Sequence, residues 1–476
     1  MGASMLTRTK IVCTIGPASR SIRQLAALVD AGMHVARLNF SHGTHAEHGA
    51  VIARLHEVAA ARGVHVGVLQ DLCGPKIRIG RFAEPQVELE LGQRFELTTE
   101  PIVGDAHRVS VNYPHLPQDV APGDRIVLAD GEIELEVLET GPSWVRCQVK
   151  VGGRLSSGKG VHIPGARLRV RAITEKDRDD LRFGVANGVD MIALSFVRDP
   201  DDVRLGKQLI RQAGGDQPVI AKIEKREALE RIDEILEVAD GIMVARGDLG
   251  VEVPLAEVPG IQKRLIAKAN AVGKPVITAT QMLASMVRNP RPTRAEATDV
   301  ANAIWDGTDA VMLSEETAAG AYPQRAVATM VRIAQAVEED ESYYQRMRAR
   351  ALPEPREIGD VLGREAVRVG AALEVRAILC PTLGGSTVRR VSRYRPRQPI
   401  IALSPEHKTL RRLSLWWGVQ PVWGQRTETM DALFAAAEER VRSLGLLASG
   451  DRVVFVATAP PGAERPRSYL QVDEIR

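Results

Sequence analysis

The chain has 476 residues, too many for one ordinary hydrophobic core, so two or three domains are expected. Hydrophobic residues make up 44% of it and charged residues 26%, as in a globular protein, and no apolar run is long enough to span a bilayer. The 63 basic and 60 acidic residues are interspersed and aromatic residues are only 4%, which argues against nucleic-acid binding. The cysteines have no CxxC spacing, so we expect reduced thiols in a cytoplasmic protein, with neither disulfides nor zinc.

Short apolar segments that end in polar residues recur along the first two thirds of the chain, with helical segments between them. A capping box at Thr293–Glu296 and a similar pattern at Thr174–Asp177 mark helix starts. The predicted strands are 10–16, 34–40, 65–71, 190–196, 218–224, 240–248, 275–281 and 309–315. Eight such units predict an α/β fold, a closed (β/α)₈ TIM barrel whose active site lies at the carboxyl ends of the strands. A doubly wound sheet is the alternative, and the number of strands argues against it.

The connection between the third and fourth strands is far longer than a usual crossover. Within it, segments 87–97, 125–138 and 144–151 alternate apolar and polar residues. We therefore predict an all-β lid domain, residues 74–167, inserted into a barrel formed by residues 1–73 and 168–353. A long helix is expected from Pro323 to about Arg350. Strands at 377–382, 399–404, 420–423 and 452–459 then predict an open-sheet α/β domain over residues 354–476.

Polar side chains gather at the predicted carboxyl ends of the barrel strands. They combine cations with two carboxylates, a set that suits transfer of a phosphoryl group bridged to a metal ion. For Lys222 and Glu224 taken by themselves, a buried salt bridge is the competing interpretation. The residues at these ends are Arg37, Asn39, Ser41, His42, Asp71, Lys76, Arg78, Ser195, Lys222, Glu224, Arg246, Gly247, Asp248, Thr278, Thr280, Gln281, Ser314 and Glu316.

Two other sequence patterns give weaker evidence for a functional site. Segment 153–160 nearly matches a Walker A loop, but Gly160 replaces the Ser or Thr that would hold Mg²⁺ and no helix is predicted after it. A lid lysine that reaches a nucleotide phosphate is the better role for Lys159. His42, His45 and His48 resemble a metal cluster with Glu47, but their spacing by three drifts around a helix, so a solvated helix start is the preferred interpretation.

Several long motifs resemble those of pyruvate kinase, and the resemblance covers nearly the whole chain. They are Thr9-Lys-Ile-Val-Cys-Thr-Ile-Gly-Pro-Ala-Ser19, Arg37-Leu-Asn-Phe-Ser-His-Gly43, Lys222-Ile-Glu224, Met243-Val-Ala-Arg-Gly-Asp-Leu-Gly-Val-Glu252, Thr278-Ala-Thr-Gln-Met-Leu283 and Asn289-Pro-Arg-Pro-Thr-Arg-Ala-Glu296. The resemblance implies Mg²⁺-dependent transfer of phosphate from phosphoenolpyruvate to ADP, giving pyruvate and ATP in the last step of glycolysis, with Mn²⁺ as an alternative metal. It also implies a homotetramer.

The resemblance assigns roles to individual residues. Glu224 and Asp248 hold the Mg²⁺ ion, Lys222 stabilises the phosphoryl group and the enolate, and Arg37 contacts the substrate phosphate. The backbone at Gly247 and Asp248 receives the substrate carboxylate, and Thr280 assists protonation of the enolate. The nucleotide-side positions are Asn39, Ser41, His42, Arg78 and Lys159, and the K⁺ site is matched by Asn39, Ser41 and Asp71.

This sequence departs from the family pattern at a few positions. Lys76 stands where the family often has Glu, and we hypothesise that its fixed cation beside Asp71 replaces K⁺. His162 replaces a usual Asn and Glu315 a smaller residue, without a predicted consequence. In the third domain, the Thr382, Gly384, Gly385, Ser386 and Thr387 loop aligns with the loop that holds phosphorylated effectors in regulated members of the family. An ordinary Gly-rich turn remains the alternative there.

Two other functions are compatible with parts of the sequence. Another Mg²⁺-dependent, enolate-forming barrel enzyme would explain Glu224 and Asp248 but not the inserted domain or Lys159. A paralogue that only senses phosphorylated effectors should have lost Lys222, Asp248 or Thr280, and all three are present. The sequence therefore favours the kinase.

Overall fold

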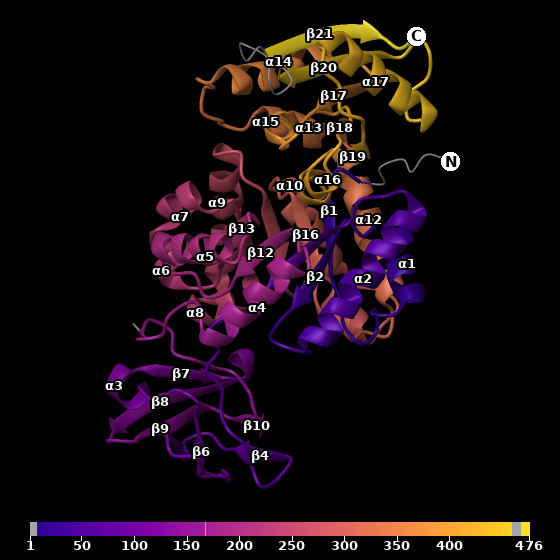
Figure 1. Ribbon diagram of the computed structural model, residues 1–476. Helices are drawn as coiled ribbons and strands as arrows, with labels where there is room; N and C mark the ends of the chain where they lie inside the picture. The colour runs from indigo at the N-terminus through magenta and orange to yellow at the C-terminus, as the bar shows by residue number, and fades with distance from the viewer. Residues whose placement is uncertain (1–6, 167, 459–467) are drawn as a thin grey trace.

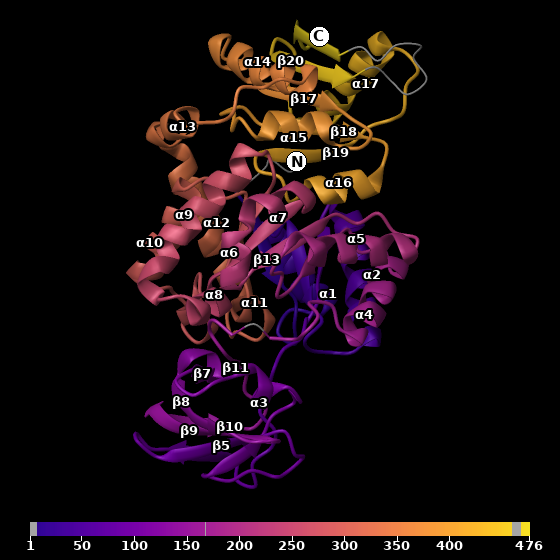
Figure 2. The ribbon, with the colours of Figure 1, turned by 90° about the vertical axis from the view of Figure 1, so that its left-hand side faces the viewer.

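The computed structural model describes residues 7–166, 168–458 and 468–476. These residues form three parts stacked in a row, with a closed barrel between a small β domain and a C-terminal α/β domain (Figures 1 and 2). No helix within the described ranges is both long and apolar enough to cross a membrane.

In the described part of the chain, eight parallel strands close the central barrel in the order β1-β16-β15-β14-β13-β12-β3-β2. The predicted barrel is confirmed, and each strand lies within its predicted range. Its strands are β1 (Lys10–Thr14), β2 (Val35–Asn39), β3 (Gly67–Asp71), β12 (Met191–Leu194), β13 (Val219–Ile223), β14 (Gly241–Ala245), β15 (Val276–Ala279) and β16 (Ala310–Leu313). Nearly every strand residue is buried, because one face fills the barrel and the other packs on helices. This explains why the strands are continuous apolar runs rather than alternating ones.

Helices surround the barrel, and several begin with the predicted side-chain caps. Both capping boxes, at Thr174 and Thr293, are present. The long helix predicted from Pro323 is interrupted at Asp340, whose side chain accepts from the Ser342 backbone and starts a second helix. The helices are α1 (Ile22–Ala31), α2 (His45–Arg62), α4 (Glu175–Ala186), α5 (Pro200–Gln212), α6 (Arg226–Glu230), α7 (Ile232–Val238), α8 (Arg246–Glu252), α9 (Val258–Ala271), α10 (Arg294–Trp305), α11 (Glu315–Ala318), α12 (Pro323–Glu339) and α13 (Glu341–Arg348), with 3₁₀ turns η2 (Leu255–Glu257) and η3 (Ala284–Val287).

The chain between β3 and α4 folds into antiparallel-rich sheets with their own apolar core. The segment predicted as one alternating run, 87–97, is broken by a turn at 90–93, so its halves join different sheets. The described residues of this domain form a small sheet that pairs β10 with β4 and a larger sheet with the strand order β11-β7-β8-β9-β5-β6. The elements are β4 (Gln86–Leu89), β5 (Arg94–Thr98), β6 (Arg108–Ser110), α3 (Leu116–Asp119), β7 (Arg125–Leu128), η1 (Ala129–Gly131), β8 (Ile133–Thr140), β9 (Trp144–Val151), β10 (Gly153–Ser156) and β11 (Val161–His162).

The C-terminal part has a mostly parallel sheet, with order β19-β18-β17-β20-β21 over the described residues. Its four predicted strands are present, but antiparallel β21 was not predicted; residue 459, where the fourth prediction ended, lies outside the described residues. The elements are α14 (Ile358–Ala372), β17 (Ala377–Pro381), α15 (Ser386–Ser392), β18 (Ile400–Ser404), α16 (His407–Leu413), β19 (Val419–Trp423), α17 (Met430–Ser443), β20 (Arg452–Thr458) and β21 (Ser468–Glu474).

The C-terminal part is fixed to the base of the barrel by buried polar contacts. Arg395 is only 2% exposed, and its guanidinium pairs with Asp309 at 2.7 Å, just before β16. Arg411 pairs with Asp190 at 2.8 Å, and Lys10 Nζ donates to the Val419 carbonyl at 2.6 Å. These contacts lie at the amino ends of the barrel strands, so they leave the carboxyl ends open to the β domain.

Candidate active site

Lys222, the penultimate residue of β13, lies at the centre of a buried polar cluster. Its ammonium is 2.8 Å from Glu224 Oε1 and 3.3 Å from Asp71 Oδ1, and it donates to Ser195 Oγ at 2.7 Å. Glu224 Oε2 accepts from the Phe196 backbone N–H at 2.9 Å. Three barrel strands thus bring together groups that are far apart in the sequence, as the pattern of strand ends predicted. Ser195 follows β12 at the equivalent position, although no role was predicted for it.

Arg37 and Asp71, on neighbouring strands β2 and β3, form a second buried pair. Arg37 Nε donates to Asp71 Oδ2 at 2.7 Å, and its Nη1 donates to Thr14 Oγ1 at 2.9 Å. Thr14 is the last residue of β1, and it was not among the predicted site residues, which begin with the second strand. Asn39 lies in register with Asp71, and its Oδ1 accepts from the Ser41 backbone N–H. Two of the residues matched to the K⁺ site are therefore neighbours, and Ser41 bonds to one of them.

The charges in this cluster compensate one another. Burial by itself would raise the pKa of Asp71, but the Lys222 and Arg37 cations outweigh it, and the pKa lies below its ordinary value. Burial opposes the charge on Lys222, yet Asp71 and Glu224 raise its pKa, so the ammonium stays charged. The pKa of Glu224 is raised, first by burial and also by the Asp248 carboxylate, against the attraction of Lys222. A divalent cation between Glu224 and Asp248 would relieve this repulsion.

At the ends of β14 and β15, Thr280 and α8 face one another. Gly247, in the first turn of α8, donates its backbone N–H to Thr280 Oγ1 at 2.7 Å. Thr280 has φ 69°, a left-handed conformation that is costly for a β-branched residue. Arg246 holds it there, because its Nη2 donates to the Thr280 carbonyl at 2.7 Å while Nη1 pairs with Asp299. The Gly247 N–H predicted to receive a carboxylate is thus engaged with Thr280, so it can serve an anion only after that bond opens.

The β domain approaches this end of the barrel. His162 Nε2 lies 3.9 Å from Asp248 Oδ1, and Arg125 donates to the Val251 carbonyl at the end of α8. Arg78 donates to the Gly158 carbonyl, and the Lys159 carbonyl accepts from the Ile79 backbone, so the two cationic segments lie side by side. No helix follows Lys159, which lies between β10 and β11, as expected for a segment that is not a Walker A loop.

Other predicted residues have local roles. Lys76, which was predicted to lie beside Asp71, forms no ion pair with it within the described ranges. Its charge acts on His42: burial first, and then the charges of Arg78, Lys76 and Arg37, lower the pKa of that imidazole. The helix start at His45 is confirmed, but His48 is not solvated: it is 9% exposed and stacks on Phe40 at 4.1 Å. Glu316 accepts from the Leu283 and Ser314 backbones and supports the loop after β15. Glu315 is exposed.

No group of three or more His, Cys, Asp or Glu side chains suited to a metal ion occurs in the portion of the chain that the structure describes. Glu224 Oε1 is buried and lacks a hydrogen bond of good geometry, although the Lys222 ammonium is close to it. A buried carboxylate oxygen of this kind fits Mg²⁺, which proteins often bind through one or two carboxylates, with water and substrate phosphates completing its shell.

Comparison with known proteins identifies the family. Residues 6–327 match the family described as "Pyruvate kinase, barrel domain", and residues 360–472 match "Pyruvate kinase, alpha/beta domain". The chain belongs to the pyruvate kinase family. Pyruvate kinases transfer the phosphoryl group of phosphoenolpyruvate to ADP to give pyruvate and ATP, and the family uses Mg²⁺ and K⁺. The chain is accordingly a phosphotransferase of glycolysis.

Relatives support the assignment along the whole chain. The pyruvate kinase of Clostridium acetobutylicum is 44% identical over 472 residues, covering 99% of this chain and 100% of its own length. That of Geobacillus stearothermophilus is 47% identical over 474 residues, covering 99% of this chain and 81% of its own. A crystal structure of a pyruvate kinase from Cryptosporidium parvum superposes with a TM-score of 0.91 at 36% identity, covering 99% of this chain and 97% of that one.

In the C-terminal domain, the predicted effector loop borders a cavity of about 290 Å³. Thr382 Oγ1 accepts from the Gly385 backbone N–H at 2.9 Å, and Gly385 has φ 82° before α15 begins. Arg390 and Arg426 also line the cavity, and Thr427 Oγ1 is buried in it without a hydrogen-bond partner among the described residues. The loop is therefore an ordered turn next to a partly cationic cavity.

Proposed function

We propose that pyruvate kinase chemistry in this chain takes place at the cluster around Lys222. The observation that carries the proposal is the contact of one buried ammonium with Glu224, Asp71 and Ser195 at the carboxyl ends of the barrel strands. Lys222 and Arg37 would bind and neutralise the phosphoryl group of phosphoenolpyruvate, because both are buried cations beside the carboxylates. In a site with little water, fixed charges of this kind stabilise a transferring phosphoryl group strongly.

Glu224 and Asp248 would hold Mg²⁺. The ion, or Mn²⁺ in its place, would neutralise charge on the substrate and on these two carboxylates when bound. Glu224 is fixed by the Phe196 backbone, whereas the Asp248 side chain is 28% exposed and can reorient toward a ligand. Glu224 would thus fix the position of the metal ion, and Asp248 would reorient to complete its coordination.

Thr280 would hold the water that protonates the enolate carbon, and the backbone at Gly247 and Asp248 would bind the substrate carboxylate. The Gly247-to-Thr280 hydrogen bond supports both assignments, because it places the hydroxyl and the start of α8 in contact. Substrate binding would exchange the Thr280 hydroxyl for the carboxylate at the Gly247 N–H. The freed hydroxyl could then bond to water.

The nucleotide would bind between the barrel and the β domain, at Asn39, Ser41, His42, Arg78 and Lys159. The proximity of the Arg78 and Lys159 segments supports this, since both carry cations suited to phosphates. Asn39, Ser41 and Asp71 would form the K⁺ site of the family, and we propose that Lys76 makes K⁺ dispensable. The charge of Lys76 contributes to lowering the pKa of His42, after burial and Arg78, which supports a role for Lys76 near the proposed nucleotide side.

The remaining proposals concern effector binding, quaternary structure and domain limits. The loop at Thr382, Gly384, Gly385, Ser386 and Thr387 would bind a phosphorylated effector, supported by the adjoining cavity with Arg390 and Arg426. An allosteric homotetramer in the cytoplasm follows from the family resemblance. The domain limits at 1–73 with 168–353, 74–167 and 354–476 are supported by the apolar clusters, because nearly all buried members of each cluster come from one of these parts; Leu415 and Trp417, which pack with the barrel, are the exceptions.

The metal assignment is tested by Mg²⁺ titration of pyruvate formation from phosphoenolpyruvate and ADP. Glu224→Gln and Asp248→Asn should each raise the Mg²⁺ concentration needed for half-maximal rate at least about tenfold, because each removes a ligand charge. Glu230→Gln, on the exposed face of α6, is the matched control and should leave the curve unchanged. A wild-type Mg²⁺ dependence in Glu224→Gln would overturn the assignment.

A further inference from the structure

A buried ion pair lies beside the two carboxylates of the proposed metal site. Lys225 comes directly after Glu224, and its Nζ donates to Glu252 Oε1. Glu252 is the last residue of α8, four positions after Asp248, so these two acids lie on the same face of the helix. The side chains of Lys225 and Glu252 are only 12% and 3% exposed. The pair thus ties the segment after β13, which carries Glu224, to the helix that carries Asp248.

Lys225 also contacts the residue that orients Glu224. Its ammonium is 5.6 Å from the centre of the Phe196 ring, a distance at which the aromatic face attracts a cation. Phe196 donates its backbone N–H to Glu224 Oε2 at 2.9 Å, and it does so from a left-handed conformation, φ 56°. Gly74 leaves the room for this ring, because a Cβ at Gly74 would lie 2.6 Å from Phe196 Cδ2. One ammonium therefore contacts the supports of both proposed metal ligands.

The carboxylates in this region act on one another. Burial first raises the pKa of Glu252, Lys225 lowers it, and the charge of Asp248 is among those that raise it again. The Asp248 charge also contributes, after burial, to the raised pKa of Glu224. Asp248 thus interacts with two buried carboxylates, of which one is paired with Lys225 and the other with Lys222. Without Lys225, Glu252 would repel Asp248 with no cation to offset it.

We propose that Lys225 and Glu252 are a positioning pair that holds α8 so that Asp248 faces Glu224 across the Mg²⁺ site. The inference rests on the proposed function, in which Glu224 and Asp248 hold the ion. Lys225 and Glu252 are not ligands themselves, because each is engaged by the other. They act as outer partners that orient the ligands, and such partners contribute strongly to metal affinity.

The test measures Mn²⁺ binding to the intact protein without substrates, from the electron paramagnetic resonance signal of free Mn²⁺. Lys225→Met should raise the Kd for Mn²⁺ at least about tenfold, because α8 loses its tie to the segment after β13. Charge alone predicts the opposite result, since removal of a cation strengthens the attraction of nearby carboxylates for Mn²⁺. Unchanged or tighter binding in Lys225→Met would overturn the proposal. Lys225→Gln provides the same comparison if the methionine variant does not fold.

Reversal of the pair separates positioning from charge. Glu252→Lys alone should weaken Mn²⁺ binding, because it places two cations side by side in a buried position. Combining it with Lys225→Glu restores an ion pair and the wild-type net charge, so the double variant should bind Mn²⁺ more tightly than either single variant. A double variant that binds no better than the single variants would contradict a role for the pair.

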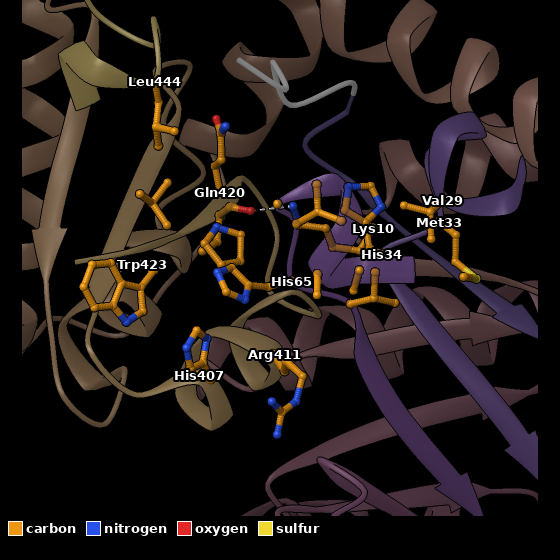
Figure 3. Close-up of a pocket in the computed structure, with 18 of the residues that line it drawn as sticks. Lys10, Val29, Met33, His34, His65, His407, Arg411, Gln420, Trp423 and Leu444 are labelled. Atoms are coloured by element: carbon orange, nitrogen blue, oxygen red, sulfur yellow. Dashed lines mark hydrogen bonds between the residues drawn. The ribbon is translucent and has the colours of Figure 1, made fainter. Parts of the chain in front are cut away.

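Arg411→Gln controls for a general loss of stability. It breaks a pair of similar burial at the amino ends of the barrel strands, where the Arg411 and Asp190 side chains are 23% and 1% exposed. Figure 3 shows Arg411 beside the cavity between the barrel and the C-terminal domain. This variant should unfold at lower urea concentration but bind Mn²⁺ as the wild type does. If it weakened Mn²⁺ binding as much as Lys225→Met, lost stability would explain both results and the proposal would fail.

Glu224→Gln distinguishes failure of this inference from failure of the proposed metal site. We expect it to weaken Mn²⁺ binding at least as much as Lys225→Met, because it removes a ligand charge rather than a support. Wild-type Mn²⁺ binding in Glu224→Gln would overturn the metal site and the positioning role with it. Weak binding in Glu224→Gln with wild-type binding in Lys225→Met would overturn the positioning role alone.

Discussion

The Arg37 guanidinium donates through Nε to Oδ2 of Asp71 at 2.7 Å, inside the carboxyl end of the barrel. The same carboxylate lies 3.3 Å from the Lys222 ammonium, and its side chain is 1% exposed. One buried anion therefore compensates two buried cations that we assign to the substrate phosphate. The arrangement keeps both cations charged and oriented before substrate arrives.

Asp71→Asn should destabilise the protein. Removing the carboxylate leaves Arg37 and Lys222 buried with less compensation, and loss of one partner of a buried pair costs about 3–5 kcal/mol. Urea unfolding followed by circular dichroism measures this. Asp30→Asn, which breaks the exposed Arg62 pair, is the control and should have a much smaller effect. Equal effects of the two substitutions would show that the buried pair contributes no special stability.

Thr280→Ala should lower kcat about a hundredfold, the usual contribution of a positioned proton-transfer group, with a smaller change in the KM for phosphoenolpyruvate. Thr280→Ser retains the hydroxyl that accepts from Gly247 and should stay within about tenfold of the wild type. Thr298→Ala, on exposed α10, controls for loss of a hydroxyl elsewhere. Similar rates for Thr280→Ala and Thr280→Ser would exclude a role for the hydroxyl.

The wild type should form pyruvate at the same rate in K⁺-free buffer and with K⁺ added, if the Lys76 ammonium supplies the positive charge that K⁺ supplies elsewhere in the family, as we propose. Lys76→Glu should make the rate depend on K⁺ by at least about tenfold, since it replaces that cation with an anion. Lys150→Glu, on exposed β9, is the control. A wild-type enzyme that is inactive without K⁺ would refute this role for Lys76.

Lys10 should make the free energy of unfolding depend on pH above about pH 7. Burial lowers its pKa to about 7, against the attraction of Glu338, while the unfolded chain has an ordinary lysine. Between pH 7 and about pH 10 the unfolded chain binds the extra proton, so the free energy of unfolding should rise with pH, by about 3 kcal/mol from pH 7 to pH 9.5. Lys10→Met should lack this rise. Parallel pH profiles of urea unfolding for the two proteins would contradict the prediction.

Much of the barrel could be predicted because its strands are buried on both faces and end in polar residues at one edge. That pattern brought Lys222, Glu224, Asp71 and Arg37 together correctly. Antiparallel β21 was missed because it is an edge strand with no apolar run, in which four of the seven residues are exposed and none is fully buried. The break at Asp340 was missed because an N-cap inside a continuous helical pattern gives little signal.

The strand pattern predicts which side chains gather at one end of the barrel, but not which of them form direct hydrogen bonds or ion pairs with one another. That Asp71 bonds to Arg37 and not to Lys76 depends on where the β domain places Lys76, which strand periodicity does not specify. The left-handed Thr280 is likewise maintained by Arg246 at the start of α8, against the local preference of a β-branched residue.

The most direct test of the account is kcat for pyruvate formation by Lys222→Met, beside Lys263→Met as a control. Lys263 pairs with Asp306 on the outside of the barrel, so the control removes the same charge away from the site. The account predicts a fall of at least about a thousandfold for Lys222→Met, with a folded circular dichroism spectrum, and no change for the control. A fall of less than tenfold in folded Lys222→Met would show that the chemistry does not depend on this ammonium.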